Sequence, residues 1–349
     1  MSAWFRMLRV VVGLELAQRV RSVAWYVLLG IVAVVVGGIV VILFVSLSGW
    51  QQDIGGAIFS TTIFLVMLVT SLVTPALSGG AINGDRDAGV LASTQVTQVT
   101  SVQLVLGKVL AAWIASLGFL AVCVPFMIGS ALLGGLRLEA VALSIPILVL
   151  EIGVVSAIGV GLSGVIRKPI LSTVVSYLVV ATLSVGTLIG FGVGAVAATE
   201  EQQWPDIAWE YDEDAAGVTE RCIETGTTYP QTVQRYDRVW LFLAANPYVI
   251  VADAIPPSFD QYGYPDDLFG QIAFGVRQAQ IPQEPTTCAD FSSSREPDAD
   301  QGREVFESTV PSWFAGLALH LALAAAAVWG AIATTRTPAR TLAPGSRIA

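Results

Sequence analysis

Few side chains in this sequence could carry out covalent or metal chemistry. It holds one histidine, His320, and three cysteines, too few for the usual histidine-based or cysteine-based centres. His320 and Glu151 both lie inside long apolar runs. If these runs cross a bilayer, an ionisable side chain inside one of them has to face protein or water. We therefore expect each to be either a polar point on a translocation pathway or a hydrogen-bonding residue that holds helices together.

Two of the cysteines could pair. Cys222 and Cys288 share a hydrophilic segment, whereas Cys123 lies in an apolar run. If that segment is outside the cell, oxidising surroundings permit a disulfide. The bond would close a loop of about 67 residues and stabilise a poorly packed domain by about 4 kcal/mol. We expect the disulfide, with two free thiols as the alternative.

A charged turn within residues 79–108 has the composition of a docking element. Its charges could set the register of a contact, and the mildly apolar stretch that follows could supply burial. An ordinary solvated loop is the alternative. The residues that we assign to docking are Asp85, Arg86, Asp87, Gly89 and Leu91.

These residues lie in or between segments that are predicted to be membrane-spanning helices. Of the 349 residues, 54% are hydrophobic and 13% are charged, and the mean hydropathy is +0.69. A bilayer core about 30 Å thick needs roughly 20 apolar residues in a helix. The stretches that qualify are Val23 to Leu47, Ala57 to Leu77, Val109 to Leu133, Ala140 to Ile166, Ile170 to Ala198 and Trp313 to Ala333. The sequence thus predicts an all-α polytopic membrane protein with six transmembrane helices.

The basic residues predict the orientation of these helices. Eleven Lys and Arg residues lie in the terminal segments and in the loops after the second and fourth spans, whereas the opposite short loops hold only Arg137. Cytoplasmic loops carry such an excess of positive charge. Both termini are therefore predicted to be cytoplasmic. The predicted parts are an interfacial segment at 1–22, transmembrane helices 1–5 at 23–198, an outer domain at 199–312, helix 6 at 313–333 and a cytoplasmic tail at 334–349.

Residues 199–312 form the predicted extracytoplasmic domain. The segment holds 21 acidic and 6 basic residues, and the whole chain has a net charge of -9, which argues against a nucleic-acid partner. Ten prolines lie in the segment and divide it into short pieces, so we expect it to be loop-rich. The apolar run from Val239 to Ile255 is too short to span a bilayer. It is either an interfacial or re-entrant element or a buried helix of the domain.

The first 22 residues have the pattern of an amphipathic helix at the membrane surface. Apolar side chains recur at helical spacing, and arginines occupy the other face. The apolar positions are Trp4, Phe5, Leu8, Val11 and Val12. A membrane-surface anchor explains this stripe, and transmission of motion would be an additional role.

The segment between spans two and three resembles the cytoplasmic loop of type 2 ATP-binding-cassette (ABC) exporter permeases. In that family an acidic-Arg-acidic-x-Gly-Thr-Leu pattern precedes a stretch that ends in Leu-Gly-Lys at the next span. The matching positions are Asp85, Arg86, Asp87, Gly89 and Leu91 in the first part, and Leu106, Gly107 and Lys108 in the second. Six spans with both termini inside also agree with the family.

This resemblance implies a set of partners. The loop would hold a coupling helix seated on a separate cytoplasmic ABC ATPase subunit, and residues 1–22 would be the connecting helix. The chain has no Gly-x-x-x-x-Gly-Lys-Ser/Thr phosphate loop, so ATP and Mg would be bound by the partner subunit. A second permease subunit, identical or different, would complete the pathway in the lipid bilayer of the cell (plasma) membrane.

Three other function classes compete with this interpretation. A membrane-anchored sensor or envelope assembly protein would share the spans and the acidic outer domain, but would have no reason to shape a loop for an ATPase. Secondary transport is disfavoured because we find no internal repeat. An intramembrane hydrolase is disfavoured because one histidine and one carboxylate give little material for a nucleophile and its base.

Overall fold

The computed structural model describes residues 3–49, 54–89, 99–133, 137–214, 217–260, 263–292 and 301–336. Within these ranges, six helical segments are long and apolar enough to cross a membrane. The prediction of a multi-pass, predominantly helical membrane protein is therefore confirmed. Leu91 and the tail beyond residue 336 lie outside the described residues.

The spans form a bundle whose centre is made by four of them. These are α3 (Gly55–Ser78), α6 (Ser101–Ala131), α7 (Leu138–Val165) and α15 (Trp313–Thr335). Glycines on α7 permit close helix contact, because a methyl group at Gly161 would come within 2.5 Å of Ala327 and one at Gly164 within 2.4 Å of Ala331. Small residues allow this packing in lipid, where apolar burial gives helices little reason to associate.

The other two spans lie at the side of the bundle. The first is α2 (Val23–Leu47), and the fifth consists of α8 (Pro169–Ala181), the π-helical turn η1 (Thr182–Gly186) and α9 (Thr187–Ala197). Both bury few side chains, and most of their apolar residues are exposed. These surfaces are suited to contact with lipid or with another membrane subunit.

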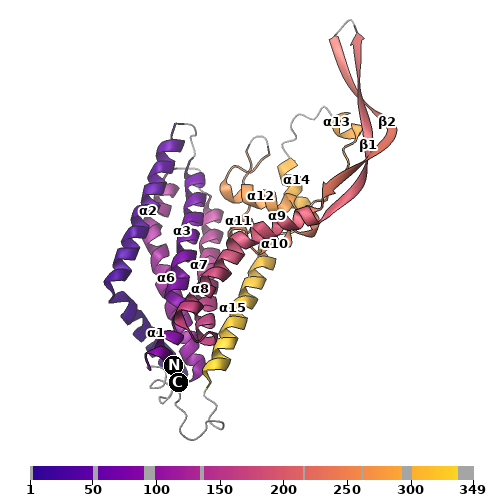
Figure 1. Cartoon of the computed structure of the whole chain (residues 1–349). Helices are drawn as coiled ribbons and strands as arrows, with labels where there is room; N and C mark the ends of the chain where they lie inside the picture. The colour runs from indigo at the N-terminus through magenta and orange to yellow at the C-terminus, as the bar shows by residue number, and fades with distance from the viewer. Residues whose placement is uncertain are drawn as a thin grey trace.

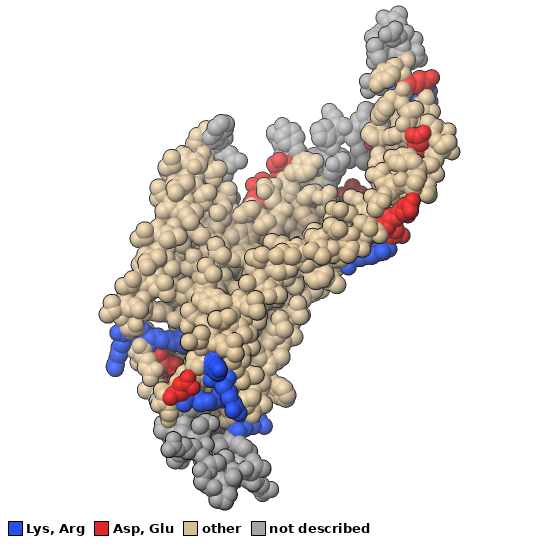
Figure 2. Space-filling view, in the orientation of Figure 1, with Lys and Arg blue, Asp and Glu red and all other residues tan. Residues whose placement is uncertain are grey.

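The two ends of the bundle differ in charge. Helix α1 (Ala3–Val20) and the end of α15 lie at one end, and the strands lie beyond the other (Figure 1). Figure 2 shows that most visible basic side chains gather near α1, whereas acidic side chains occur along the strands and at that outer end. Charge therefore separates along the bundle axis.

The third span begins earlier than predicted. Helix α6 starts at Ser101 rather than near Val109, so its first two turns lie in the segment that we assigned to the loop. Thr100 and Gln103 form a capping box that explains this start, because each side chain meets the backbone N–H group of the other. The described part of the preceding loop holds the short helix α4 (Asn83–Asp87).

The loop-rich prediction is wrong for residues 199–234. Strands β1 (Thr199–Asp214) and β2 (Gly217–Gln234) pair as a long antiparallel ribbon that projects from the bundle (Figure 1). Pro205 and Pro230 lie inside these strands instead of ending them. A two-stranded ribbon has two unpaired edges, which accommodate a residue without an N–H group.

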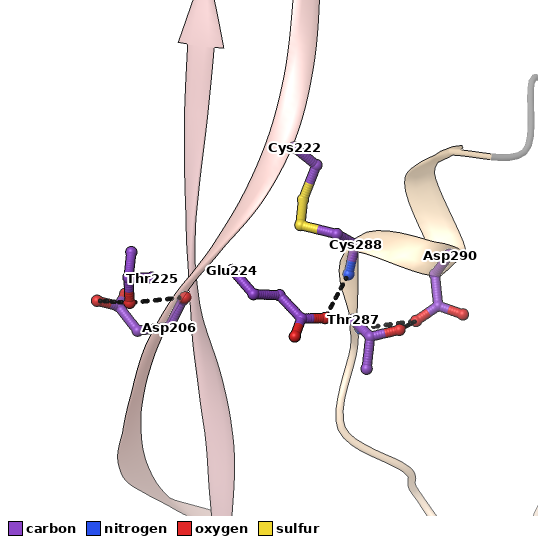
Figure 3. The surroundings of a disulfide bond; sticks show 7 residues. All are labelled: Asp206, Cys222, Glu224, Thr225, Thr287, Cys288 and Asp290. Carbon is purple, nitrogen blue, oxygen red and sulfur yellow. Dashed lines mark hydrogen bonds between the residues drawn. A yellow bond between two sulfur atoms is a disulfide. The ribbon is translucent and has the colours of Figure 1, made fainter.

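An irregularity in this ribbon has its own stabilising contacts. The register shifts between Pro205 and Ile207, and Gly226 opposite has a φ of 78°, which glycine adopts readily. The hydroxyl of Thr225 donates to the carbonyl and to the carboxylate of Asp206 at 3.0 and 3.1 Å (Figure 3). The bulge is thus held by side chains as well as by backbone pairing.

A disulfide joins Cys222 on β2 to Cys288 at the start of α13 (Cys288–Ser292). The carboxylate of Glu224 accepts a hydrogen bond from the Cys288 N–H group at 3.3 Å (Figure 3). Trp209 packs edge-on against Phe291 beside this bond, with ring centroids 5.2 Å apart. The covalent link and the aromatic contact fasten α13 to a ribbon that has little core of its own.

The other described helices of the outer domain are short. They are η2 (Tyr236–Arg238), α10 (Leu241–Ala244), α11 (Pro247–Asp253), α12 (Leu268–Gln278) and α14 (Gln301–Ser308), and α10, α11 and α12 among them contact the bundle. The run Val239–Ile255 is therefore helical and interrupted, and α11 is largely buried against α12, α15 and α7. Phe269 of α12 packs against Phe59 of α3 in the main hydrophobic core.

Candidate functional site

The first candidate site is a charge cluster at the end of the bundle that holds α1. Lys108 is only 1% exposed, and its ammonium group contacts two carboxylates from different elements. Glu15 of α1 is one partner, and Asp85 of α4 is the other, at 2.6 Å. We call these three residues the Lys108 cluster. One buried cation thereby ties the amphipathic helix, the loop and the third span together.

The sequence places Glu15 beside Arg19 at helical spacing, but its carboxylate contacts Lys108. Burial lowers the pKa of the Arg19 guanidinium, and the nearby Glu15 charge opposes this shift. Around them, Val11 of α1 packs against Leu104 of α6, whereas Trp4 and Phe5 are exposed. The face of α1 that carries Val11 and Glu15 therefore serves contact with the bundle.

Helix α4 is also fastened to the end of α7. The hydroxyl of Ser163 accepts hydrogen bonds from the backbone N–H groups of Ile82 and Asn83, at 2.8 and 3.2 Å. The Asn83 side chain donates to the Ile166 carbonyl at 3.0 Å, and the Ser163 hydroxyl donates to the Asn83 amide oxygen. All of Ile82, Asn83 and Ser163 are buried. Displacement of α4 would therefore be transmitted to α7 as well as to α1 and α6.

The predicted docking residues differ in their surroundings. The Asp85 carboxylate contacts Lys108 within the chain, and Arg86 is half-buried. Asp87 and Gly89 are exposed, and Gly89 ends the helical turn with a φ of 72°. The side chains of α4 available to a partner are therefore Arg86 and Asp87, while Asp85 and Lys108 have an internal role that the sequence does not reveal.

The second candidate site lies inside the membrane-spanning bundle. Glu151 of α7 and His320 of α15 are 2% and 1% exposed, and the His320 Nδ1 atom lies 2.8 Å from the Glu151 Oε2 atom. The His320 Nε2 atom lies 3.0 Å from the backbone carbonyl oxygen of Ala245, which follows α10. The structure thus brings together the two ionisable residues that the sequence singles out, 169 positions apart.

The outer domain is joined to α15 by a third buried cluster. Asp253 of α11 accepts a hydrogen bond from the Arg277 guanidinium at 2.7 Å. The other oxygen of Asp253 accepts from the Ser312 hydroxyl at 2.7 Å and from the backbone N–H groups of Ser312 and Trp313. No sequence pattern points to this cluster, because its members come from three separated segments.

Comparisons with known proteins add no family to this description. No protein-family model matches the chain. No curated protein matches it either.

Proposed function

We propose that the chain is the permease subunit of a type 2 ABC exporter, driven by a separate cytoplasmic ATPase subunit that binds ATP and Mg. The observation that supports this most is the Lys108 cluster. A coupling loop has to pass a displacement from a partner to the membrane helices. Here α4 is attached to α1 and α6 through Lys108, and to α7 through Ser163.

The proposed transport mechanism follows from these attachments. An ATPase that moves α4 would shift the ends of α6 and α7 together, because neither buried contact can break without leaving a charge or N–H group unpaired. A second permease subunit would pack on exposed apolar surface such as that of α2 or of the fifth span. The pathway would lie between the two subunits.

We expect Arg86→Glu to weaken ATPase binding. A reversed charge at an interface costs several kcal/mol, whereas Arg86 has no role in the Lys108 cluster, so the variant should fold and insert. The measurement is co-purification of the ATPase and its turnover in nanodiscs. Arg221→Glu, on the exposed surface of β2, is the matched control. Equal behaviour of the two variants would remove the main support for the exporter proposal.

The orientation that this function requires is testable separately. We expect a cysteine at Asp87 to be cytoplasmic and one at Glu307 to be outside, since basic residues accumulate at the α1 end. Both positions are exposed, and the native Cys123 is buried. In intact cells a membrane-impermeant maleimide should label only Glu307→Cys, and Asp87→Cys should react after permeabilisation. The opposite pattern would invert the topology.

One observation favours a second candidate, a sensor or envelope assembly protein. The ribbon of β1 and β2 exposes Trp209, Tyr211 and Tyr229 at 43%, 62% and 43%, far from the bundle (Figure 1). Aromatic side chains of this kind are enriched at protein interfaces. If deletion of the ribbon abolished function while ATPase binding and turnover were absent from the native protein, the sensor would be the better description.

A further inference from the structure

A small cavity lies against the buried Glu151–His320 pair. It is bordered by α3, α7, the fifth span, α11 and α15, and its volume is about 20 Å³. This is room for one water-sized group. Most of its wall is apolar, from residues such as Met67, Leu148 and Ile152. The half-buried residues Val180 and Leu183 lie on the fifth span, whose other side chains are largely exposed.

The hydrogen bonds of the pair determine its protons. The Ala245 carbonyl can only accept, so His320 Nε2 carries a hydrogen. At Nδ1, one proton is held between the imidazole and Glu151 Oε2. The pair is neutral overall, as an imidazolium with a carboxylate or as an imidazole with a carboxylic acid. Tyr248 is the other titratable side chain among the residues that line the cavity.

Two polar atoms at this cavity are buried and lack a hydrogen-bond partner among the described residues. They are the Glu151 Oε1 atom and the Ser184 hydroxyl oxygen. Ser184 lies in the π-helical turn η1, and its backbone carbonyl accepts a hydrogen bond from Asn246 at 2.6 Å. π-helical turns are frequent at functional sites. Unpartnered buried oxygens cost free energy, and a donor-rich group in the cavity would remove that cost.

We propose that this cavity binds the head group of a primary-amine amphiphile that enters from the bilayer. An ammonium group has three donors and no acceptor, and it is about the size of a water molecule, so it matches the cavity volume and the need of the two oxygens for donors. A trimethylammonium head is too large and has no N–H donor. A carboxylate or phosphate head would repel Glu151. The apolar wall and the exposed fifth span provide surface for the alkyl chain.

Protons and charge are conserved when the amine binds. A neutral amine enters from the lipid, and its nitrogen lone pair takes the proton that Glu151 and His320 share. Glu151 is left as a carboxylate, and His320 stays neutral with its Nε2–H group on Ala245. The Nδ1 atom has then lost the shared proton, and one of the three N–H groups of the ammonium takes its place as the donor between Nδ1 and Glu151. The charge of the site is zero before and after, and no other reactant is needed. This inference is independent of the proposed function, because binding requires no ATPase.

The test uses the full chain in phosphatidylcholine nanodiscs. Dicyclohexylcarbodiimide reacts with protonated carboxyl groups in apolar surroundings. Modification of Glu151 is followed by peptide mass as the sum of its N-acylurea and its dodecylamide, because a primary amine can displace the activated carbodiimide adduct. We expect dodecylamine to slow this modification about tenfold, and dodecanol or dodecyltrimethylammonium to leave it unchanged. Ser184→Ala should weaken the protection. Ser172→Ala is the matched control, since Ser172 is another buried, unpartnered serine of the fifth span that does not line the cavity.

Native mass spectrometry supplies the second measurement. The protein without substitutions and the Ser172→Ala variant should each bind one dodecylamine per chain, whereas the Glu151→Gln variant should bind none. Equal protection by all three amphiphiles would show a general effect on the bilayer and overturn the proposal. Absence of a Glu151-dependent bound amine would also overturn it, whether or not the carbodiimide reaches Glu151, and would leave the cavity as a site for water.

Discussion

Replacing Lys108 with alanine should lower the stability of the chain by about 3 kcal/mol. The lysine is 1% exposed, whereas Glu15 and Asp85 keep 17% and 32% exposure. Removal of the ammonium group leaves two neighbouring carboxylates that repel each other in a partly enclosed site. The two carboxylates keep partial access to water, so the loss of stability should be at the lower end of the range measured for buried ion pairs. The apparent unfolding temperature in detergent should fall by about 6 °C.

The second lysine of the chain provides the control for this prediction. Lys168 is exposed at the start of α8, and Lys168→Ala should change the unfolding temperature little. Removing all three charges of the Lys108 cluster, with Lys108→Met, Glu15→Gln and Asp85→Asn, should recover most of the loss, because no unpaired charge remains. If Lys108→Ala and Lys168→Ala are equally stable, the cluster does not hold α1 and α4 to α6.

Replacing Asp253 with alanine should destabilise the chain by about 4 kcal/mol. Its side chain is fully buried and meets the Arg277 guanidinium, the Ser312 hydroxyl and the first backbone N–H groups of α15. The variant would leave Arg277, only 6% exposed, without its carboxylate. Thermal unfolding in detergent measures the loss, and protease sensitivity of the segment before α15 should rise with it.

An exposed carboxylate of the same domain serves as the comparison for Asp253. Glu307 lies on the surface of α14, and Glu307→Ala should be close to neutral. The stability of Asp253→Asn should lie between those of Asp253→Ala and Glu307→Ala. Its amide oxygen can still accept a hydrogen bond from Ser312, but it offers no negative charge to Arg277. If Asp253→Ala is as stable as the unmodified chain, then apolar contacts alone, such as Phe269 against Phe59, hold the outer domain on the bundle.

The outer ribbon was predicted to be loop-rich although its sequence contains a strand pattern. Ile207, Trp209 and Tyr211 alternate with Ala208 and Glu210, which is the spacing of a strand. The prolines outweighed this signal in the prediction. They are compatible with strands here because the ribbon has only two strands and each has a free edge. A paired strand needs its partner, and local composition does not specify which segment of the chain that partner is.

The amino-acid sequence was enough to predict the six spans, because a bilayer demands a long apolar run for every helix and each run can be recognised alone. It also placed Cys222 and Cys288 in one hydrophilic segment, since position along the chain decides which residues share a segment. The contact of Glu151 with His320, and the burial of Lys108 between two carboxylates, become visible in the folded chain alone. These partners lie on different helices and depend on how the helices rotate and pack, which no local spacing encodes.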